Sequence, residues 1–195
     1  MKIIGITGGV GSGKSRVLSY MEERFGAVIC QAEHVAWTLQ EPGEACHTEI
    51  VNLFGDTILN DDNTINRKTL GAIVFADTEK LLQLNKIMHP AVKREIIKQI
   101  ETESQKGTAY FVIEAALLLE DHYDAICDEL WYIYTKEDVR RARLMESRGY
   151  STEKIDSIMK SQLPEVSFFE QCQIVIDNSG DFNDTCYQIQ KAMKQ

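Results

Sequence analysis

The stretch Gly8-Gly9-Val10-Gly11-Ser12-Gly13-Lys14-Ser15 decides the fold of this chain. The apolar run Ile3-Ile4-Gly5-Ile6 precedes it. Apolar residues at helical spacing follow it, at Val17, Leu18, Met21 and Phe25. This order predicts a buried strand, a glycine-rich loop and an amphipathic helix. The loop matches the pattern G-x-x-x-x-G-K-[ST] in full, which is typical of a phosphate-binding P-loop when these flanks are present.

Each residue type in the P-loop has a chemical reason. Glycines without a Cβ let backbone N–H groups point inward, and the start of the next helix adds its positive dipole end. We expect Gly8, Gly11, Ser12 and Gly13 to surround the phosphates of a nucleoside triphosphate. Lys14 is expected to reach the β- and γ-phosphates, and the Ser15 hydroxyl to bind Mg²⁺.

Composition narrows the class of protein. A chain of 195 residues is long enough for one domain with a sizeable core. The net charge of −9 argues against a general nucleic-acid binder, because such proteins need a basic face. We find neither an apolar run of about 18 residues nor the pattern of a signal peptide, so no membrane partner is expected. The five cysteines form no C-x-x-C pair, which favours reduced thiols in a cytoplasmic protein.

Further strands are predicted along the chain. Short apolar runs lie at 27–30, 110–113, 129–134 and 174–176, and helical stretches separate them. This alternation predicts a five-stranded parallel sheet flanked by helices. Glu114 directly follows the third strand, where P-loop enzymes place a carboxylate that holds Mg²⁺ directly or through water.

Glu33 follows the second strand and allows two interpretations. At the carboxyl end of a parallel strand it would face the phosphates, where ligands bind in such sheets. A carboxylate at the start of a helix is equally ordinary, because it favours the positive end of the helix dipole. The residues alone leave both open.

The segment from 34 to about 105 shows mostly helical periodicity. Asn66 is predicted to cap a helix, and Pro90 is predicted to lie in a first helical turn with His89 extended before it. A basic cluster in this segment could receive an anionic substrate or form a solvated face. Its members are Arg67, Lys68, Lys86, His89, Lys93 and Arg94.

Four arginines lie close together between the last two strands, at positions 140, 141, 143 and 148. On a helix, Arg140 and Arg143 would share one side, whereas Arg141 and Arg148 would point elsewhere. One interpretation is a charged surface helix paired with Glu137 and its acidic neighbours. The other, which we favour near a P-loop, is a mobile lid that brings guanidinium groups to the phosphoryl group in transfer.

Two functional classes fit a P-loop at this point: a small-molecule kinase and a nucleotide-gated switch. A switch of the GTPase kind recognises guanine with Asn-Lys-x-Asp. Here the Asn85-Lys86-Ile87-Met88 stretch lacks the aspartate, so we favour a kinase. Within a kinase, Glu33 is the best candidate for the base that accepts the acceptor's hydroxyl proton.

The chain also resembles the dephospho-coenzyme A kinase family over nearly its whole length. The marks of this resemblance occur in a fixed order along the sequence. They are the P-loop with Ile6-Thr7 before it, Gly26-Ala27-Val28-Ile29, Glu41-Pro42-Gly43, Phe54-Gly55, Ile58-Leu59-Asn60, Asn66-Arg67, Val74-Phe75, His89-Pro90, Leu117-Leu118-Leu119-Glu120, Ser161-Gln162 and Val175-Ile176-Asp177-Asn178-Ser179-Gly180.

The resemblance implies a specific reaction, the ATP-dependent phosphorylation of the ribose 3′-hydroxyl of dephospho-CoA. It implies one P-loop kinase domain over 1–195, with a core at about 1–30 and 108–195, a helical substrate region at about 31–107 and a lid at about 138–168. It further implies ATP, Mg²⁺ and dephospho-CoA as ligands, and a monomer or weak homo-oligomer. The residues then expected to bind the nucleotide include Arg16 and Asn178. Those expected to act in catalysis are Lys14, Glu33, Arg140 and Arg143. Those expected to bind the substrate are Glu33, Arg67, His89, Lys93 and Glu114. Other P-loop small-molecule kinases, and a weakly active nucleotide-binding relative, stay as alternatives.

Two stretches depart from the family pattern. The family's Asp-Ala-Asp after the second strand is Gln31-Ala32-Glu33 here, so one acid is absent and the other is one methylene longer. After the Ser-Gln pair, where the family often has arginines, the chain has Leu163-Pro164-Glu165-Val166-Ser167-Phe168. Arg140 and Arg143 are expected to compensate.

Overall fold

The computed structural model describes residues 1–194, and these form two compact units. The core unit comprises Met1–Ile29 and the chain from Glu103 onward, and the helical unit comprises Cys30–Thr102. Within the described residues, no helix is both long enough and apolar enough to cross a membrane. Within residues 1–194, none of the five cysteines is placed in a disulfide.

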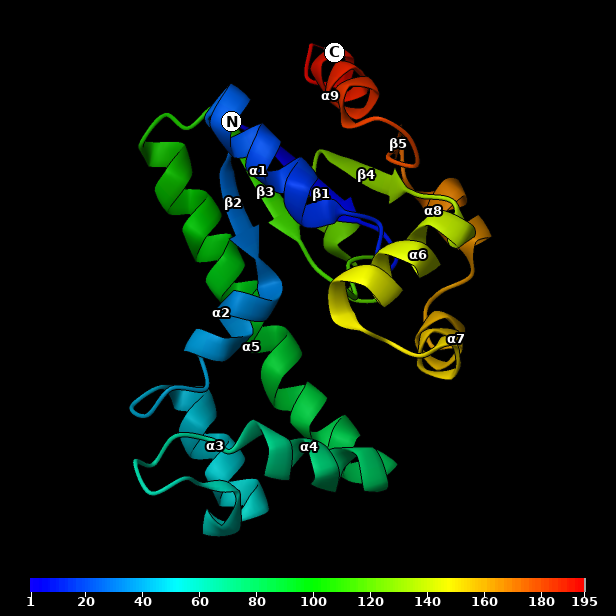
Figure 1. Cartoon of the computed structure of the whole chain (residues 1–195). Coiled ribbons are helices and arrows are strands. Elements are labelled where there is room, and N and C mark those ends of the chain that lie inside the picture. The colour runs from blue at the N-terminus through cyan, green and yellow to red at the C-terminus, as the bar shows by residue number, and fades with distance from the viewer. Residues whose placement is uncertain (195) are drawn as a thin grey trace. The chain divides into compact units, whose positions relative to one another are not determined.

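A five-stranded sheet has the order β2-β3-β1-β4-β5, and β1 pairs in parallel with β3 and β4, as β4 does with β5 (Figure 1). Its strands are β1 (Lys2–Thr7), β2 (Val28–Gln31), β3 (Tyr110–Glu114), β4 (Glu129–Tyr134) and β5 (Ile174–Asp177). The predicted α/β fold of the P-loop type is confirmed. Because paired strands run parallel, their carboxyl ends share one edge of the sheet, where ligands bind in this architecture.

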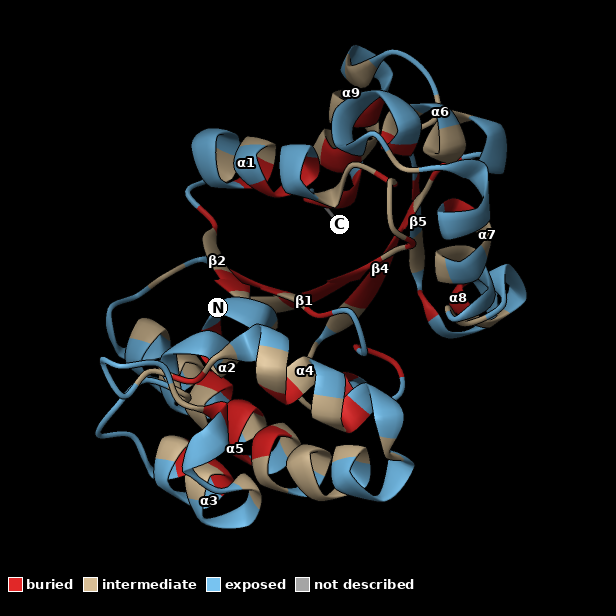
Figure 2. Cartoon of the chain, turned by 60° about the horizontal axis from the view of Figure 1, so that its bottom comes forward, coloured by how far each residue is buried: buried red, intermediate tan, exposed pale blue. Residues whose placement is uncertain are grey.

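The core unit adds helices on the sheet. These are α1 (Lys14–Phe25), α6 (Glu137–Arg148), α7 (Thr152–Lys160), α8 (Glu165–Gln171) and α9 (Phe182–Ala192), with the 3-10 turn η2 (Tyr123–Ala125). Helices α1 and α9 lie on the same face of the sheet, whose strands are largely buried (Figure 2). Gly26 ends α1 in the left-handed conformation with φ 63°, as a helix-terminating glycine does.

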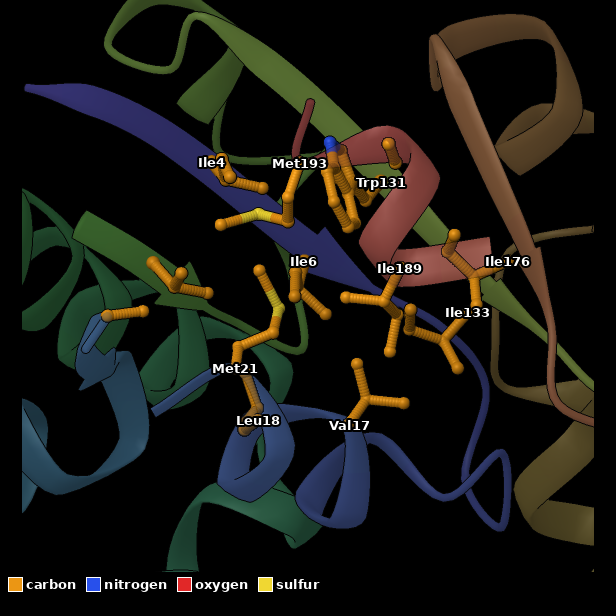
Figure 3. Packing of buried hydrophobic residues seen from close by; sticks show 13 residues of the cluster. Ile4, Ile6, Val17, Leu18, Met21, Trp131, Ile133, Ile176, Ile189 and Met193 are labelled. Carbon is orange, nitrogen blue, oxygen red and sulfur yellow. The ribbon is translucent and has the colours of Figure 1, made fainter. Parts of the chain in front are cut away.

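The main hydrophobic core fills the layer between the sheet and these two helices (Figure 3). Trp131 of β4 is fully buried there with Met21 of α1 and Ile189 of α9. Large apolar side chains buried on parallel strands and on one helical stripe contribute most of the free energy that holds such a layer together. This packing fixes where β1 ends and α1 begins, and therefore fixes the loop between them.

The outer edge strand β5 is partly covered by one side chain. The Gln188 Nε2 atom donates to the Asp177 carbonyl at 2.9 Å, and the Gln188 Oε1 atom accepts from the Asp177 N–H at 2.9 Å. The amide of Gln188 thus forms the pair of hydrogen bonds that a neighbouring strand would form.

The helical unit contains α2 (Ala32–Thr38), α3 (Ala45–Phe54), η1 (Asp56–Ile58), α4 (Arg67–Ala76) and α5 (Thr78–Gln105). Asn66 caps α4 as predicted, because its side chain accepts from the Thr69 N–H at 3.0 Å. A hydrogen bond of 2.7 Å between His47 Nε2 and the Asn63 carbonyl ties α3 to the turn before α4.

The prediction for His89 and Pro90 was wrong. Helix α5 runs through both residues without a break, so Pro90 lies in the helix interior and His89 is helical. Proline removes one backbone donor from the ladder and leaves the Lys86 carbonyl without its usual partner. The neighbouring Met88, Ala91, Val92 and Ile96 are buried on this helix, and their packing offsets the local cost.

Candidate active site

The P-loop, residues 8–15, connects the end of β1 to the start of α1, as the sequence predicted. Gly11 and Gly13 adopt φ of 83° and 82°, a left-handed backbone that side chains disfavour. Within residues 1–194, the backbone N–H groups of Gly13, Lys14 and Ser15 have no acceptor. Together with the uncapped start of α1, these donors form a site for an anion.

Lys14 extends across the mouth of this loop. Its Nζ atom donates to the Gly8 carbonyl at 2.7 Å and lies 3.8 Å from the Glu114 Oε1 atom. Burial lowers the pKa of the Lys14 ammonium, the Glu114 carboxylate opposes this, and the Arg140 and Arg148 guanidiniums lower it further. The charge of Lys14 is therefore costly to hold here, and an incoming anion would stabilise it.

The oxygen donors nearby fit a magnesium ion bound together with phosphate. Ser15 is exposed at the first turn of α1, and Glu114 ends β3 in register with Ile6, two positions before the P-loop. Within residues 1–194 no cluster of three or more His, Cys, Asp or Glu side chains could hold a metal alone. Mg²⁺ suits such a sparse set, because it keeps waters and phosphate oxygens as ligands.

Arg140 of α6 holds the tip of the P-loop. Its Nε atom donates to the Val10 carbonyl at 2.9 Å, and its NH2 group donates to the Gln162 Oε1 atom at 2.7 Å. The same Gln162 oxygen accepts from the Val10 N–H at 3.3 Å. A Cβ at Gly9 would collide with the Arg140 guanidinium in its present position, so a larger residue there would displace the arginine side chain.

Arg143 lies on the same side of α6, as the helical spacing predicted. Its NH1 group approaches the Ser12 carbonyl at 3.4 Å, and its NH2 group donates to the Asn178 carbonyl at 2.9 Å. Arg141 points elsewhere and pairs with Glu137 at 2.8 Å and with Asp156 of α7 at 2.7 Å. The surface-helix interpretation thus holds for Arg141, whereas Arg140 and Arg143 contact the P-loop backbone.

Arg16 and Asn178 were both predicted at the nucleotide. The Arg16 guanidinium lies over the Phe182 ring, 3.8 Å from its centroid, on the exposed side of α1. Asn178 is buried, and its Nδ2 atom donates to the Ser12 carbonyl at 2.7 Å. The Ser12 hydroxyl is also buried and has no hydrogen-bond partner within residues 1–194.

The helical unit holds the other predicted site residues. Glu33 lies in the first turn of α2 and is exposed. The Arg67 guanidinium, at the start of α4, lies 4.5 Å from the centroid of the Trp37 ring. His34 lies on the same helix as Trp37, with 5.1 Å between their ring centroids.

The basic cluster of this unit is divided between its helices. Arg67 and Lys68 begin α4, and the remaining members belong to α5. Lys86 and Arg94 line a cavity of about 380 Å³ together with the start of α3, whereas the half-buried His89 and Lys93 do not line it. The cluster is therefore divided between two helices, and only two of its members line this cavity.

Four residues with contacts at these sites were not predicted from the sequence to act there. The sequence indicates Gln162 only as part of the Ser-Gln pair and predicts no role for the other three. These are Trp37, Thr135, which lies 3.0 Å from the Ser12 carbonyl, and Thr185, which lies 3.0 Å from the Asn178 side-chain oxygen. Contacts such as Val10–Gln162 join residues 152 positions apart, and local sequence patterns carry no signal for them.

The fold and the loop geometry define a P-loop protein of the nucleoside-triphosphate-binding α/β class. The chain belongs to the dephospho-CoA kinase family, whose sequence profile it matches over residues 2–184. A dephospho-CoA kinase from Shouchella clausii is 36% identical over 190 residues, covering 97% of this chain and 96% of that protein.

Solved structures share the fold. The Thermus thermophilus protein TT1252 has a TM-score of 0.85 and 25% identity, covering 99% of this chain and 96% of its own. A dephospho-CoA kinase from Campylobacter jejuni has a TM-score of 0.74 and 23% identity, covering 100% of this chain and 96% of its own.

Proposed function

We propose that this chain transfers the γ-phosphoryl group of ATP to the ribose 3′-hydroxyl of dephospho-CoA, giving coenzyme A and ADP. The observation that carries the proposal is the family match over almost the whole chain, together with a P-loop whose backbone donors and Lys14 converge at the start of α1. Phosphoryl transfer depends mainly on positioning and charge neutralisation, which such a site supplies.

The core unit binds ATP in this proposal. The P-loop amides and Lys14 hold the β- and γ-phosphates, and Arg140 and Arg143 add positive charge beside the loop. Ser15 and, directly or through water, Glu114 would hold Mg²⁺, which neutralises charge on the phosphates when it is bound. Residues 138–168 act as the lid that excludes water from the reacting groups.

The helical unit receives the acceptor. Arg67, His89 and Lys93 bind the anionic groups of dephospho-CoA, and Glu33 accepts the proton of the 3′-hydroxyl. The hydroxyl oxygen then forms a bond to the γ-phosphorus while the bond between the γ-phosphorus and the β,γ-bridging oxygen breaks and ADP departs. The five cysteines, none of them in a disulfide within residues 1–194, support a reducing, cytoplasmic location. We expect a monomer or weak homo-oligomer.

An ADP-release assay tests the proposal directly. The purified chain receives ATP and Mg²⁺ with one of four acceptors: dephospho-CoA, AMP, pantetheine or shikimate. We expect ADP release above background only with dephospho-CoA, accompanied by coenzyme A in the product. Faster ADP release with any other acceptor would assign the chain to another group of P-loop small-molecule kinases. Equal background rates with all four acceptors would indicate a weakly active relative that binds nucleotides.

A further inference from the structure

The carbonyl of Ser12 is surrounded by three donors from three parts of the core unit. The Asn178 Nδ2 atom lies 2.7 Å from this oxygen, the Thr135 Oγ1 atom 3.0 Å, and the Arg143 NH1 group 3.4 Å. Asn178 follows β5, Thr135 follows β4 and Arg143 belongs to α6. The Thr135 hydroxyl has one hydrogen, which it shares with the Tyr134 carbonyl at 2.8 Å. Because a carbonyl oxygen has two lone pairs, Asn178 and Arg143 can fill both, and Thr135 adds a third contact.

The donors are themselves held in place. The Asn178 Oδ1 atom accepts from the Thr185 hydroxyl of α9 at 3.0 Å, and the Asn178 N–H donates to the Tyr134 carbonyl at 2.8 Å. Since a carbonyl can only accept, the Ser12 oxygen also fixes which end of the Asn178 amide faces it. The Arg143 NH2 group closes the network on the Asn178 carbonyl at 2.9 Å.

This network contains most of the buried polar side chains of the structure. Within residues 1–194 these are Thr7, Ser12, Thr135, Asn178 and Thr185, and the side chains of Thr135, Asn178 and Thr185 belong to it, whereas Ser12 takes part through its backbone carbonyl. Burying polar groups is costly unless each is hydrogen-bonded, so such a concentration at one carbonyl indicates a positional requirement.

The requirement follows from the planarity of the peptide bond. In a trans peptide the C=O and the next N–H point in opposite directions. Holding the Ser12 carbonyl toward Asn178 and Thr135 therefore turns the Gly13 N–H the other way. That N–H is one of the donors without an acceptor within the described chain. A Cβ at Gly13 would come within 2.5 Å of the Asn178 Nδ2 atom, so Asn178 packs directly against this peptide.

We propose that Asn178 is a positioning residue that acts on the phosphate chain through the Ser12–Gly13 peptide, and that it does not recognise the nucleoside. Thr135 and Arg143 hold the same carbonyl, and Thr185 orients Asn178. The inference rests on the proposed function only in that the P-loop binds the phosphates of a nucleotide, and it makes no use of the acceptor.

Two ligands separate positioning from nucleoside contact: ADP, and inorganic tripolyphosphate, which has phosphates but no nucleoside. Calorimetry measures both on the full chain, for wild type and for Asn178→Ala. We expect both affinities to fall by the same factor, roughly ten- to a hundredfold, the scale for losing one hydrogen bond to a charged group. The exposed Asn183→Ala, five positions further along, serves as the matched control and should change neither affinity.

Three results would overturn the inference. A loss confined to ADP would mean that Asn178 contacts the nucleoside. Unchanged binding of both ligands would mean that the network only stabilises the fold. Failure of the wild type to bind tripolyphosphate at millimolar concentration would mean that the loop does not hold phosphates by itself.

A milder variant covers the case in which Asn178→Ala does not fold. Thr185→Val removes only the hydroxyl that orients Asn178, and we expect it to weaken both ligands equally, by a smaller factor. Unequal or absent weakening in Thr185→Val contradicts the proposal. Because these measurements involve no acceptor, an inactive enzyme that still shows equal weakening would refute the proposed reaction and leave this inference standing.

Discussion

The P-loop and the predicted acceptor residues of the helical unit are built in different ways. The loop is held by two buried hydrogen bonds, from the residues that follow β4 and β5, and by a partly buried one from α6. In the helical unit, Glu33 and Arg67 are exposed, and the contact found for Arg67 is with the face of Trp37. On the proposed function, we expect a nucleotide site that is formed before the ligand arrives and an acceptor site whose side chains become ordered with their substrate.

The largest expected effect tests whether the helical unit takes part in chemistry as well as in binding. We expect Glu33→Gln to lower kcat by ~10²–10⁴, the scale for a general base, and to leave ATP binding intact. Glu33→Asp should retain far more turnover, because the carboxylate remains and only its reach changes. Steady-state kinetics with both substrates would measure this. A wild-type rate in Glu33→Gln would contradict the assignment of Glu33 as the base and would favour its interpretation as a carboxylate at a helix start.

The next prediction tests the P-loop, the site that we expect to be formed before the ligand binds. Lys14→Ala should lower the transfer rate by ~10²–10³, because it removes a positive charge from the β- and γ-phosphates in the transition state. Lys191→Ala, on the exposed surface of α9, is the matched control and should keep the wild-type rate. Circular dichroism checks that both variants fold. Near-normal turnover in a folded Lys14→Ala protein would contradict the assignment of the P-loop.

A smaller effect should distinguish the two sites by substrate. Arg67→Gln is expected to raise the KM for dephospho-CoA by about tenfold, with the KM for ATP nearly unchanged. Single changes of His89 and Lys93 should act on the same parameter. Equal effects on both substrates would mean that these residues act on the whole fold and not on the acceptor.

Trp37 sharpens this test, because its ring lies beside the Arg67 guanidinium. Trp37→Leu should raise the KM for dephospho-CoA by about two- to fivefold, the scale for an exposed cation–π contact. In the double variant with Arg67→Gln, the loss of Trp37 should add little, since the partner is already absent. Fully additive losses would show that the two side chains act separately.

The smallest predicted effect concerns pH. The Glu114 carboxylate raises the pKa of Lys14 against the lowering by burial. Glu114→Gln should therefore lower the pKa of Lys14 further and move the alkaline limb of the kcat/KM profile to lower pH. Measuring kcat/KM across the alkaline range would show this shift. If the alkaline limb did not move, the ionisation that it reports would not be that of Lys14.

The stability linked to Lys14 follows from the same pKa. Because its folded pKa lies below the ordinary value of 10.5, the unfolded chain binds more protons between these two values. The contribution of Lys14 to the free energy of unfolding therefore increases as pH rises through this window. Chemical denaturation of wild type and Lys14→Met across the window would check the sign, since the variant should lose this rise.

The features predicted correctly from the sequence are those that depend on residues close together in the chain. The P-loop, the position of Glu114 at the end of β3 and the cap at Asn66 each depend on a few neighbouring residues, and each was predicted. Pro90 was misplaced because a local preference for the first helical turn was overridden by the packing of α5. No local pattern could show that Asn178 lies beside Ser12, 166 residues earlier, since only the assembled sheet brings them together.

The side-chain cover on β5 has a consequence for the molecule in a crowded solution. An outer strand with unpaired N–H and C=O groups is a template on which another chain can add a strand, and this is how many sheets begin to aggregate. At Asp177 both groups are already taken by Gln188. An incoming strand would have to displace that amide first, so this edge is protected against intermolecular strand addition at the carboxyl end of β5.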